Sequence, residues 1–386
     1  MVGAGPAGAT TALSLLAARP HLKGRVAIIE RRALPRVKIC AGAVGGRALE
    51  RLAGLGVCRD ELLDGQPERP AQVFGLAVTT EEGPLFRRHP RPIGWVVRRR
   101  WFDHALVRAA ERRGVVVHAP RRYLSHRVTP ESVTVETDAG SLRAEALVGA
   151  DGVGSAVRRH LDLPLGDTHA QAVELDTAWS RQDLGTDLLH FDLRRGPFPG
   201  YAWDFPTLVD GQSRACRGVY ALTRSPVARD EQDVGTRLDA HLTALGLPDG
   251  PRRRFAERGL PLHQPISRPR VLLAGEAAGI DPVLGEGIAQ AVHYGHLAGH
   301  ALAEALSGED FSFRTWRTRV HRSRLGLDLK LRRWLLPWLY GDTRPWVERL
   351  VSRSTALARS GQHYFAGERI PRPLIAVALA DTLLSF

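Results

Sequence analysis

The first nine residues, MVGAGPAGA, constrain the fold more than any other part of the chain. Gly3, Gly5 and Gly8 form the pattern G-x-G-x-x-G, and an alanine- and leucine-rich stretch that predicts a helix follows them. In such a unit the first glycine makes a tight turn, the second lets the backbone approach a pyrophosphate, and the third lets helix and strand pack closely. Residues 25–29 predict a buried strand that ends at Glu30, where an acid can bind a ribose hydroxyl. The pattern therefore predicts a dinucleotide site at a helix N-terminus, whose N–H groups attract phosphate.

The strand that should precede Gly3 is represented only by Met1 and Val2, where about five residues are usual. Either the start of the chain was assigned too late, or the sheet lacks most of that strand. We expect the first, with the true start upstream of Met1. A version extended upstream should then bind its dinucleotide more tightly, and equal affinity and stability of the two versions would contradict this.

Composition narrows the class of protein. A length of 386 residues allows two domains, and 44% hydrophobic with 25% charged residues is ordinary for a globular protein. The three cysteines, Cys40, Cys58 and Cys216, are too few and too scattered for a disulfide scaffold, and no C-x-x-C suggests a metal site. We therefore expect no metal and a reducing, cytoplasmic compartment.

The formal net charge of +13 comes almost entirely from arginine, because lysine occurs only at Lys23, Lys38 and Lys330. The arginines are spread along the chain in short groups, as a GC-rich coding bias would leave them, and no nucleic-acid-binding module surrounds them. We expect no nucleic-acid partner. The uncharged N-terminal run has no basic residue before it, and the glycine pattern explains it better than a signal peptide does.

Two later glycine-containing segments complete a resemblance to a known superfamily. Residues 149–158, GADGVGSAVR, follow a predicted hairpin over 132–148, and residues 271–288, VLLAGEAAGIDPVLGEGI, precede a small-residue helix that reaches about Leu306. With the N-terminal glycines, these segments resemble, in the same order, the three motifs of flavoprotein monooxygenases and reductases with a glutathione-reductase-like FAD fold. The resemblance implies FAD as the cofactor.

This resemblance also assigns roles to individual positions. The Asp151-Gly152 segment would lie near the pyrophosphate, and the late acid, Glu276, would bind the ribitol. Most of the superfamily has Asp there, so we expect FAD to bind with a shifted contact. The turn after Pro282 would direct N–H groups at the N1–C2 edge of the flavin, where they stabilise its reduced anion. The predicted FAD-binding residues are Gly3, Gly5, Pro6, Ala7, Gly8, Glu30, Arg31, Lys38, Arg99, Asp151, Gly152, Gly275, Glu276, Gly285, Gly287 and Ile288.

Arg99 enters this set through residues 99–106, which are similar to an R-x-x-F-D-x-x-L segment whose arginine reaches the flavin side. The alternative is that Phe102 and Leu106 form a core pair one helical turn apart while Arg99 lies in solvent.

Two stretches resemble the geranylgeranyl reductase branch. Residues 35–42, PRVKICAG, are similar to its P-R-x-K-x-C-G-G loop, with Ala41 in place of the first glycine, and residues 199–206, PGYAWDFP, are similar to its G-Y-x-W-x-F-P segment. Tyr201 and Trp203 alternate with Phe205, so the three rings share one strand face and could form an apolar wall for an isoprenoid or polyketide-like substrate. The alternative is ordinary aromatic packing on a half-buried sheet.

The predicted catalytic residues are Cys40, Tyr201 and Trp203. The resemblance places Cys40 beside the isoalloxazine, where it could position the substrate or assist protonation. A low thiol pKa would need a basic neighbour, for which Arg36 and Lys38 are the candidates. The alternative is that Cys40 is a small buried apolar residue.

The resemblance implies an FAD-dependent oxidoreductase that reduces carbon–carbon double bonds of an isoprenoid or related lipid. The alternatives are an FAD-dependent monooxygenase of secondary metabolism and, more distantly, a non-catalytic flavin-binding redox partner. Halogenation is disfavoured because the W-x-W-x-I-P motif of halogenating relatives is absent. No second G-x-G-x-x-G occurs, so NAD(P)H or another electron donor would visit only transiently.

The expected fold is an α/β chain in which an FAD-binding Rossmann domain carries an inserted β-sheet substrate domain and a helical C-terminal extension. The FAD-binding domain would comprise residues 1–60, 98–160 and 256–306, the substrate domain 61–97 and 161–255, and the extension 307–386. Four of the eight tryptophans fall in this extension, interleaved with arginine. Residues 316–346 could make a peripheral contact with an anionic membrane, or the extension could form a helical cap over the substrate cavity.

Overall fold

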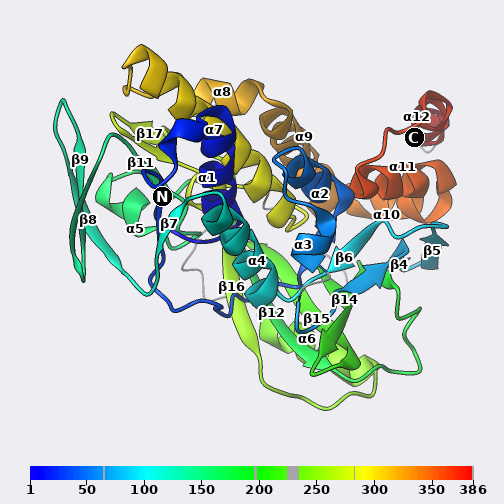
Figure 1. The fold of residues 1–386 in the computed structure, drawn as a ribbon. Helices are drawn as coiled ribbons and strands as arrows, with labels where there is room; N and C mark the ends of the chain where they lie inside the picture. Colours follow the sequence, from blue (N-terminus) through cyan, green and yellow to red (C-terminus); the bar gives the residue numbers. More distant parts are fainter. Residues whose placement is uncertain (64–65, 195–197, 224–233, 282, 385–386) are drawn as a thin grey trace.

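The computed structural model describes residues 1–386 except 64–65, 195–197, 224–233, 282 and 385–386. Pro282 of the late glycine-rich segment lies outside the described residues, as do residues 231–233 at the start of the helix predicted for 231–245. The remainder of that helix is observed as α6 (Val234–Ala244). Figure 1 shows a mixed α/β fold in which the first and middle parts of the chain intermingle and the last part forms a group of helices.

The nucleotide-binding unit is built around Val2. This residue forms parallel bridges with Ile29 on one side and Gly149 on the other, and so joins two small sheets. The pairing of residues 147–149 with residues 271–273 brings the central and late glycine segments into the same layer. The strands of this layer are β7 (Val116–His118), β1 (Ala27–Ile29), β11 (Leu147–Gly149), β18 (Val271–Leu273) and β17 (Ser267–Arg268).

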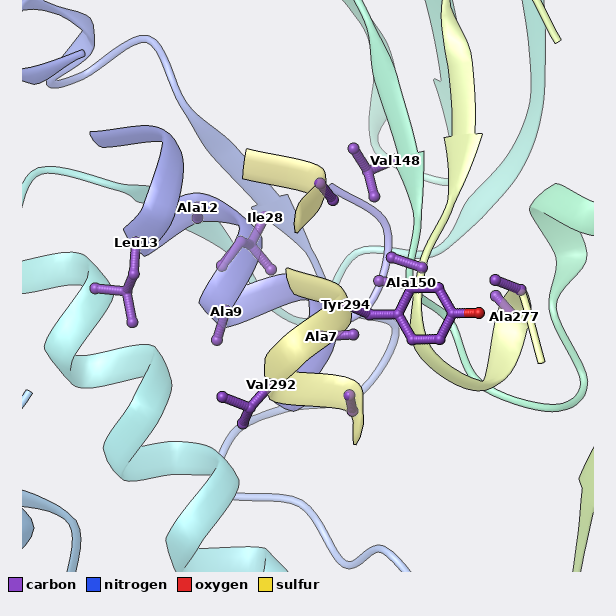
Figure 2. Close-up of a cluster of buried hydrophobic side chains, with 14 of the residues drawn as sticks. Ala7, Ala9, Ala12, Leu13, Ile28, Val148, Ala150, Ala277, Val292 and Tyr294 are labelled. Atoms are coloured by element: carbon purple, nitrogen blue, oxygen red, sulfur yellow. The ribbon is translucent and has the colours of Figure 1, made fainter. Parts of the chain in front are cut away.

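Two helices of small residues pack against this layer. They are α1 (Pro6–Ala18), which lies against β1 and is buried from Pro6 through Leu16, and α7 (Ile288–Gly308), which packs on α1. A Cβ atom on Gly295 of α7 would lie 2.6 Å from the Ala7 carbonyl oxygen, so the helix backbones can approach only because this position is glycine. Figure 2 shows the short side chains between the crossing helices, with the Tyr294 ring beside Ala7 and Ala150. A third helix, α4 (Arg99–Arg112), covers α1.

The second layer is a seven-stranded sheet, seen at the bottom of Figure 1. All its neighbouring strands are antiparallel except β13 and β4, which are parallel. Helix α6 packs on one face, and the other face carries a cluster of aromatic side chains. The strand order is β16 (Arg253–Arg258), β12 (His169–Thr177), β15 (Gln212–Thr223), β14 (Gly200–Val209), β13 (Leu188–Asp192), β4 (Gly75–Thr80) and β5 (Gly83–Arg88).

Strand β16 spans the expected boundary between residues 255 and 256, and the division of the chain into three parts stays a prediction. The hairpin predicted over 132–148 is formed by β9 (Val133–Thr137) and β10 (Gly140–Ala144), and β8 (Tyr123–Val128) adds a third strand. Its last residues do not continue the hairpin, because β11 turns away to pair with β18. The small connecting elements are β2 (Ala43–Gly45), β3 (Ala71–Val73), β6 (Gly94–Val96), α2 (Gly46–Ala53), α3 (Arg59–Leu63), α5 (Ala156–His160) and the short 3₁₀ turns Pro20–Leu22 and Gly275–Ala277.

The C-terminal part is helical, as expected. Ser323 and Ser354 cap two of the helices by accepting hydrogen bonds from Gly326 N and Leu357 N, and Gly367 ends the second of these helices in the left-handed region. In the part of the chain that the structure describes, no helix is both long and apolar enough to cross a bilayer. The helices are α8 (Trp316–Arg322), α9 (Arg324–Tyr340), α10 (Arg344–Arg353), α11 (Thr355–Ala366) and α12 (Arg372–Leu384).

The end of α11 packs closely against Gly45 and Gly46, where β2 ends and α2 begins. A Cβ atom on Gly45 would lie 2.3 Å from the Phe365 carbonyl oxygen, and one on Gly46 would lie 1.9 Å from the Ala366 carbonyl oxygen. Phe365 packs on the cluster of aromatic side chains, so the C-terminal helices cover part of that face.

Candidate cofactor and active site

A cavity of about 560 Å³ opens where the strands of the nucleotide-binding layer end and α1 begins. Its volume is typical of ligand sites, and this edge of an open α/β sheet is where ligands bind. Most of the residues predicted to bind the cofactor line it, whereas Gly8, Gly275, Tyr201 and Trp203 do not. The predicted residues in its wall are Gly3, Gly5, Pro6, Ala7, Glu30, Arg31, Lys38, Cys40, Arg99, Asp151, Gly152, Glu276, Gly285, Gly287 and Ile288.

The three N-terminal glycines occupy different surroundings. Gly3 has a φ of +104°, and a Cβ atom there would lie 2.3 Å from the Ala150 carbonyl oxygen. A Cβ atom on Gly8 would lie 2.0 Å from the Gly3 carbonyl oxygen, which explains why this residue lies behind the wall. A Cβ atom on Gly5 would have one neighbour within 4 Å among the described residues, the guanidinium of Arg36 at 3.6 Å. The backbone therefore faces open space at the start of α1. This helix end has no side-chain cap, and its N–H groups are available to a phosphate.

Glu30 is buried and held by the backbone. Its carboxylate accepts hydrogen bonds from Ala4 N and Arg32 N, both at 3.1 Å. Arg36 donates to the same carboxylate at 3.0 Å and also contacts Asp103 at 3.3 Å. Arg36 therefore joins Glu30 to α4, and the prediction that it could be the basic neighbour of Cys40 is replaced by this pairing.

Asp151 organises the central loop. It accepts hydrogen bonds from the Ser155 hydroxyl at 2.5 Å and from Ala156 N at 2.7 Å, and so holds the start of α5 beside the cavity. The arginine of the same motif, Arg158, is buried and donates to the Ala277 carbonyl oxygen at 3.1 Å. This contact ties the central segment to the late one, a role that the motif alone did not indicate.

Glu276 lies where three segments meet. It accepts a hydrogen bond from Val153 N at 3.3 Å, and the Lys38 ammonium is 3.7 Å away. A Cβ atom on Gly152 would lie 3.5 Å from this carboxylate. Glu276 and Glu30 thus place acceptor oxygens in the wall of one cavity, with the open helix terminus at Gly5 in the same wall. This arrangement fits a dinucleotide with a ribose, a pyrophosphate and a ribitol.

Asp281 and the loop over residues 283–287 are held from two sides. Asp281 accepts a hydrogen bond from Val283 N at 2.8 Å, and Arg332 of α9 forms ion pairs with Asp281 and Glu286. Tyr340 of α9 donates to the Val283 carbonyl oxygen at 2.6 Å. No sequence motif indicated the two α9 residues, because they lie some 50 residues from the loop they hold.

Tyr201 also holds this loop. Its hydroxyl donates to the Leu284 carbonyl oxygen at 2.6 Å, and a Cβ atom on Gly285 would lie 3.1 Å from that hydroxyl. Gly285 has a φ of +69°, so both its conformation and its surroundings require glycine. Tyr201 therefore supports the cavity from behind its wall.

The charges of two residues of the cavity wall, Arg99 and, more weakly, Lys38, act on Cys40. Its sulfur accepts a hydrogen bond from Gly42 N at 3.4 Å, and burial raises the pKa of the thiol against the opposing charge of Arg99. Arg99 is 9% exposed and paired with Asp103 at 2.6 Å, so its side chain does not lie in solvent. Gly42 takes the positive φ in this loop, +83°, which explains why Ala41 is tolerated in place of the preceding glycine.

Tyr201, Trp203 and Phe205 share one face of β14, as the alternation predicted. The Trp203 ring lies over Gly218 of the next strand, where a Cβ atom would be 2.2 Å from the indole. The Tyr201 ring stacks on Tyr220 at 5.3 Å. This aromatic face is packed within the protein, so Trp203 lies away from the cavity.

Two residues of β16 line the cavity from the same sheet, and neither was singled out from the sequence. They are Phe255 and Glu257. Their alternation along a predicted strand could have indicated a shared face, but only the pairing of β16 with β12 shows which face it is. Tyr220 donates a hydrogen bond to Glu257 at 2.9 Å.

The open helix end at Gly5, the two acids in the cavity wall and the sheet beside it are the arrangement expected of a flavoprotein oxidoreductase. Residues 1–312 match the model of the FAD-binding domain family, and the cofactor is therefore FAD. The chain belongs to this family and, within it, to the geranylgeranyl reductases.

Comparison with individual proteins supports this placement. The chain is 31% identical to digeranylgeranylglycerophospholipid reductase 1 of Methanopyrus kandleri over 81% of this chain and 82% of that protein. It is 30% identical to menaquinone reductase of Mycobacterium tuberculosis over 92% and 88% of the two chains. A geranylgeranyl bacteriochlorophyll reductase-like structure from Thermoplasma acidophilum has the same fold, with a TM-score of 0.75, 21% identity, and coverage of 99% of this chain and 95% of that one.

Proposed function

We propose that this flavoenzyme reduces carbon–carbon double bonds in the isoprenoid part of a lipid. The observation that carries the proposal is the position of the cavity between the FAD-binding segments and the seven-stranded sheet, whose Phe255 forms part of the cavity wall. Two relatives are named for their reduction of lipids, a digeranylgeranylglycerophospholipid and menaquinone. When bound and reduced, FAD supplies a hydride.

The residues of this chain would hold FAD along the length of the cavity. We assign the pyrophosphate to the open backbone at Gly5, the adenosine ribose to Glu30, and the ribitol to Glu276 with Lys38. The N–H groups of the Gly285–Ile288 turn would face the flavin ring. Cys40 and Arg99 would lie beside the ring, where the buried thiol orients the substrate.

The Gly5 assignment has a direct test, because a side chain there has room to fit. Gly5→Val should fold normally, since the one described neighbour within 4 Å of a Cβ atom there, the Arg36 guanidinium, lies at an ordinary contact distance of 3.6 Å. It should be purified without yellow colour because the valine occupies the pyrophosphate position. Gly308→Val at the end of α7, which also has open space around it and lies outside the cavity, is the matched control and should stay yellow. A fully yellow Gly5→Val variant would contradict the assignment.

The electron donor would be NAD(P)H or a protein such as ferredoxin that visits transiently. Mixing the yellow enzyme anaerobically with NADH, NADPH or reduced ferredoxin should bleach the flavin with one of them. If all three leave the flavin oxidised while dithionite reduces it, the donor belongs to another class.

A peripheral membrane contact is supported by exposed side chains on α9. Leu327, Leu331 and Trp334 follow one another at spacings of four and three residues, and Trp334 is 64% exposed. Basic residues, including Arg322 and Arg324, lie in α8 and at the start of α9. Trp316, by contrast, is buried and donates to the Leu273 carbonyl oxygen at 3.0 Å, so we propose that the contact lies in the α9 part of residues 316–346.

Flotation with liposomes tests this contact. The protein should float with anionic vesicles and less so at high salt, and Leu331→Ser with Trp334→Ser should abolish flotation. Phe86→Ser on β5, an exposed aromatic residue outside the C-terminal helices, is the control. Equal flotation of all variants, or none by the wild type, would contradict the contact.

The decisive test of the activity is anaerobic turnover by photoreduced enzyme with mass detection. A lipid with geranylgeranyl chains should gain two mass units for each double bond reduced, and menaquinone should gain them in its side chain. A product that requires oxygen and gains sixteen mass units would instead indicate the monooxygenase.

A further inference from the structure

Glu257 is a buried carboxyl group in the wall of the cavity. It is 5% exposed and lies on the edge strand β16, two residues after Phe255, so both side chains reach the cavity from the same strand face. A Cβ atom on Gly287 would lie 4.0 Å from its Oε1 atom. The carboxyl group is therefore next to the turn that we assign to the flavin ring.

The surroundings of Glu257 favour its neutral form. The hydrogen bond that the Tyr220 hydroxyl donates lowers the pKa of Glu257, but the carboxyl group forms no ion pair with any described residue. The carboxylates of Glu276 and Asp281 face it, and Lys38 opposes them only weakly. Burial and these like charges raise the pKa of Glu257 to about 8, so at pH 7 the group carries a proton.

The other acidic groups of this region are placed differently. Glu174 is buried, but Arg253 lies 3.4 Å from it and it does not line the cavity. Glu276 contacts the Lys38 ammonium and accepts a hydrogen bond from Val153 N. Among the described residues of the cavity wall, Glu257 is thus the carboxyl group without a cation or backbone N–H to stabilise its negative charge.

We propose that Glu257 donates the proton that completes reduction of the substrate double bond. This inference rests on the function proposed above. The π bond of the alkene breaks, one carbon receives the hydride supplied by reduced FAD, and the other receives the carboxyl proton of Glu257. The alkene gains two hydrogens, the flavin is oxidised, and Glu257 is left as a carboxylate that the Tyr220 hydroxyl stabilises until solvent returns a proton.

Infrared spectroscopy tests the protonation state without turnover. The difference spectrum of wild type minus Glu257→Gln should contain the carbonyl band of a protonated carboxyl group at pH 7, and this band should fade with a midpoint near pH 8. A carboxyl group that is already ionised at pH 7 would overturn the proposal.

Single-turnover reduction of the lipid by photoreduced enzyme tests the role. Glu257→Gln should slow this step by about 100-fold or more while FAD content and photoreduction are unchanged, and Glu257→Asp should recover part of the rate. Glu304→Gln, a surface variant on α7, is the matched control. An unchanged rate in Glu257→Gln while the wild type reduces the lipid would overturn the assignment of Glu257 alone. A wild type that binds FAD and reduces no lipid would overturn the proposed function and this inference together.

Discussion

Individual residues of the site divide into those that the sequence identifies and those that only the fold reveals. Gly3, Gly5 and Glu30 were predictable because each acts within one local unit of strand, turn and helix. Glu257 was not, because its role follows from the register of β16 against β12 and from Tyr220 on a third strand. A buried acid has no sequence signature of its own.

The buried state of Glu257 has a consequence for stability. The folded protein retains this proton up to a pKa of about 8, whereas an unfolded glutamate loses it near 4.5, so the folded state binds more protons between these values. This group should therefore make the FAD-free protein less stable as pH rises from about 5 to 8, by up to about 1.4 kcal/mol per pH unit. The stability of Glu257→Gln, measured by urea unfolding, should fall less steeply over this range. Parallel pH profiles for the two proteins would contradict a neutral Glu257.

At the scale of elements, the prediction of α1, β1 and the helix after the late motif succeeded because glycine pattern and apolar runs are local signals. The prediction joined β11 to the hairpin, because the residues after β10 continue the strand pattern. Only the pairing of β11 with β18 shows that it is a separate strand. The contact between α1 and α7 was also beyond prediction, because Gly295 and Gly299, which permit it, lie almost 300 residues along the chain from the α1 residues they contact.

This helix contact should be intolerant of side chains. Gly295→Val would insert two methyl groups where even a Cβ atom lies 2.6 Å from the Thr10 side chain, so we expect a loss of about 3 kcal/mol or more in the free energy of unfolding. Gly308→Ala at the end of the same helix has no neighbour within 4 Å and should be neutral or slightly stabilising. Urea unfolding of both variants checks the prediction, and equal stabilities would contradict the close packing.

At the scale of the whole molecule, Arg332 connects the C-terminal helices to the loop beside the flavin site. Its guanidinium is buried and paired with Asp281, Glu286 and, at 3.3 Å, Asp328. Composition alone indicated only that the extension was rich in arginine and tryptophan. It could not distinguish this buried arginine from its exposed neighbours, because both occur in the same helical segment.

Neighbouring arginines provide a matched comparison. Arg332→Met should lower the free energy of unfolding by about 3–5 kcal/mol, because it leaves the buried Asp281 charge without its partner, and should weaken FAD binding by loosening the loop. Arg333→Met, which removes a pair with the largely exposed Asp167, should cost less than about 1 kcal/mol and leave FAD binding unchanged. Thermal unfolding and FAD titration measure both effects, and similar behaviour of the two variants would show that the connection is unimportant.

The pairing of β11 with β18 also determines when the cofactor can be acquired during synthesis. Gly5 and Glu30 are synthesised first, but the layer that supports them is completed only by residues 271–273. Arg332 and Tyr340, which hold the loop, are synthesised later still. At about 5–20 residues per second, many seconds separate the first glycine from the last support of the loop. FAD therefore has no complete site until most of the polypeptide has emerged from the ribosome.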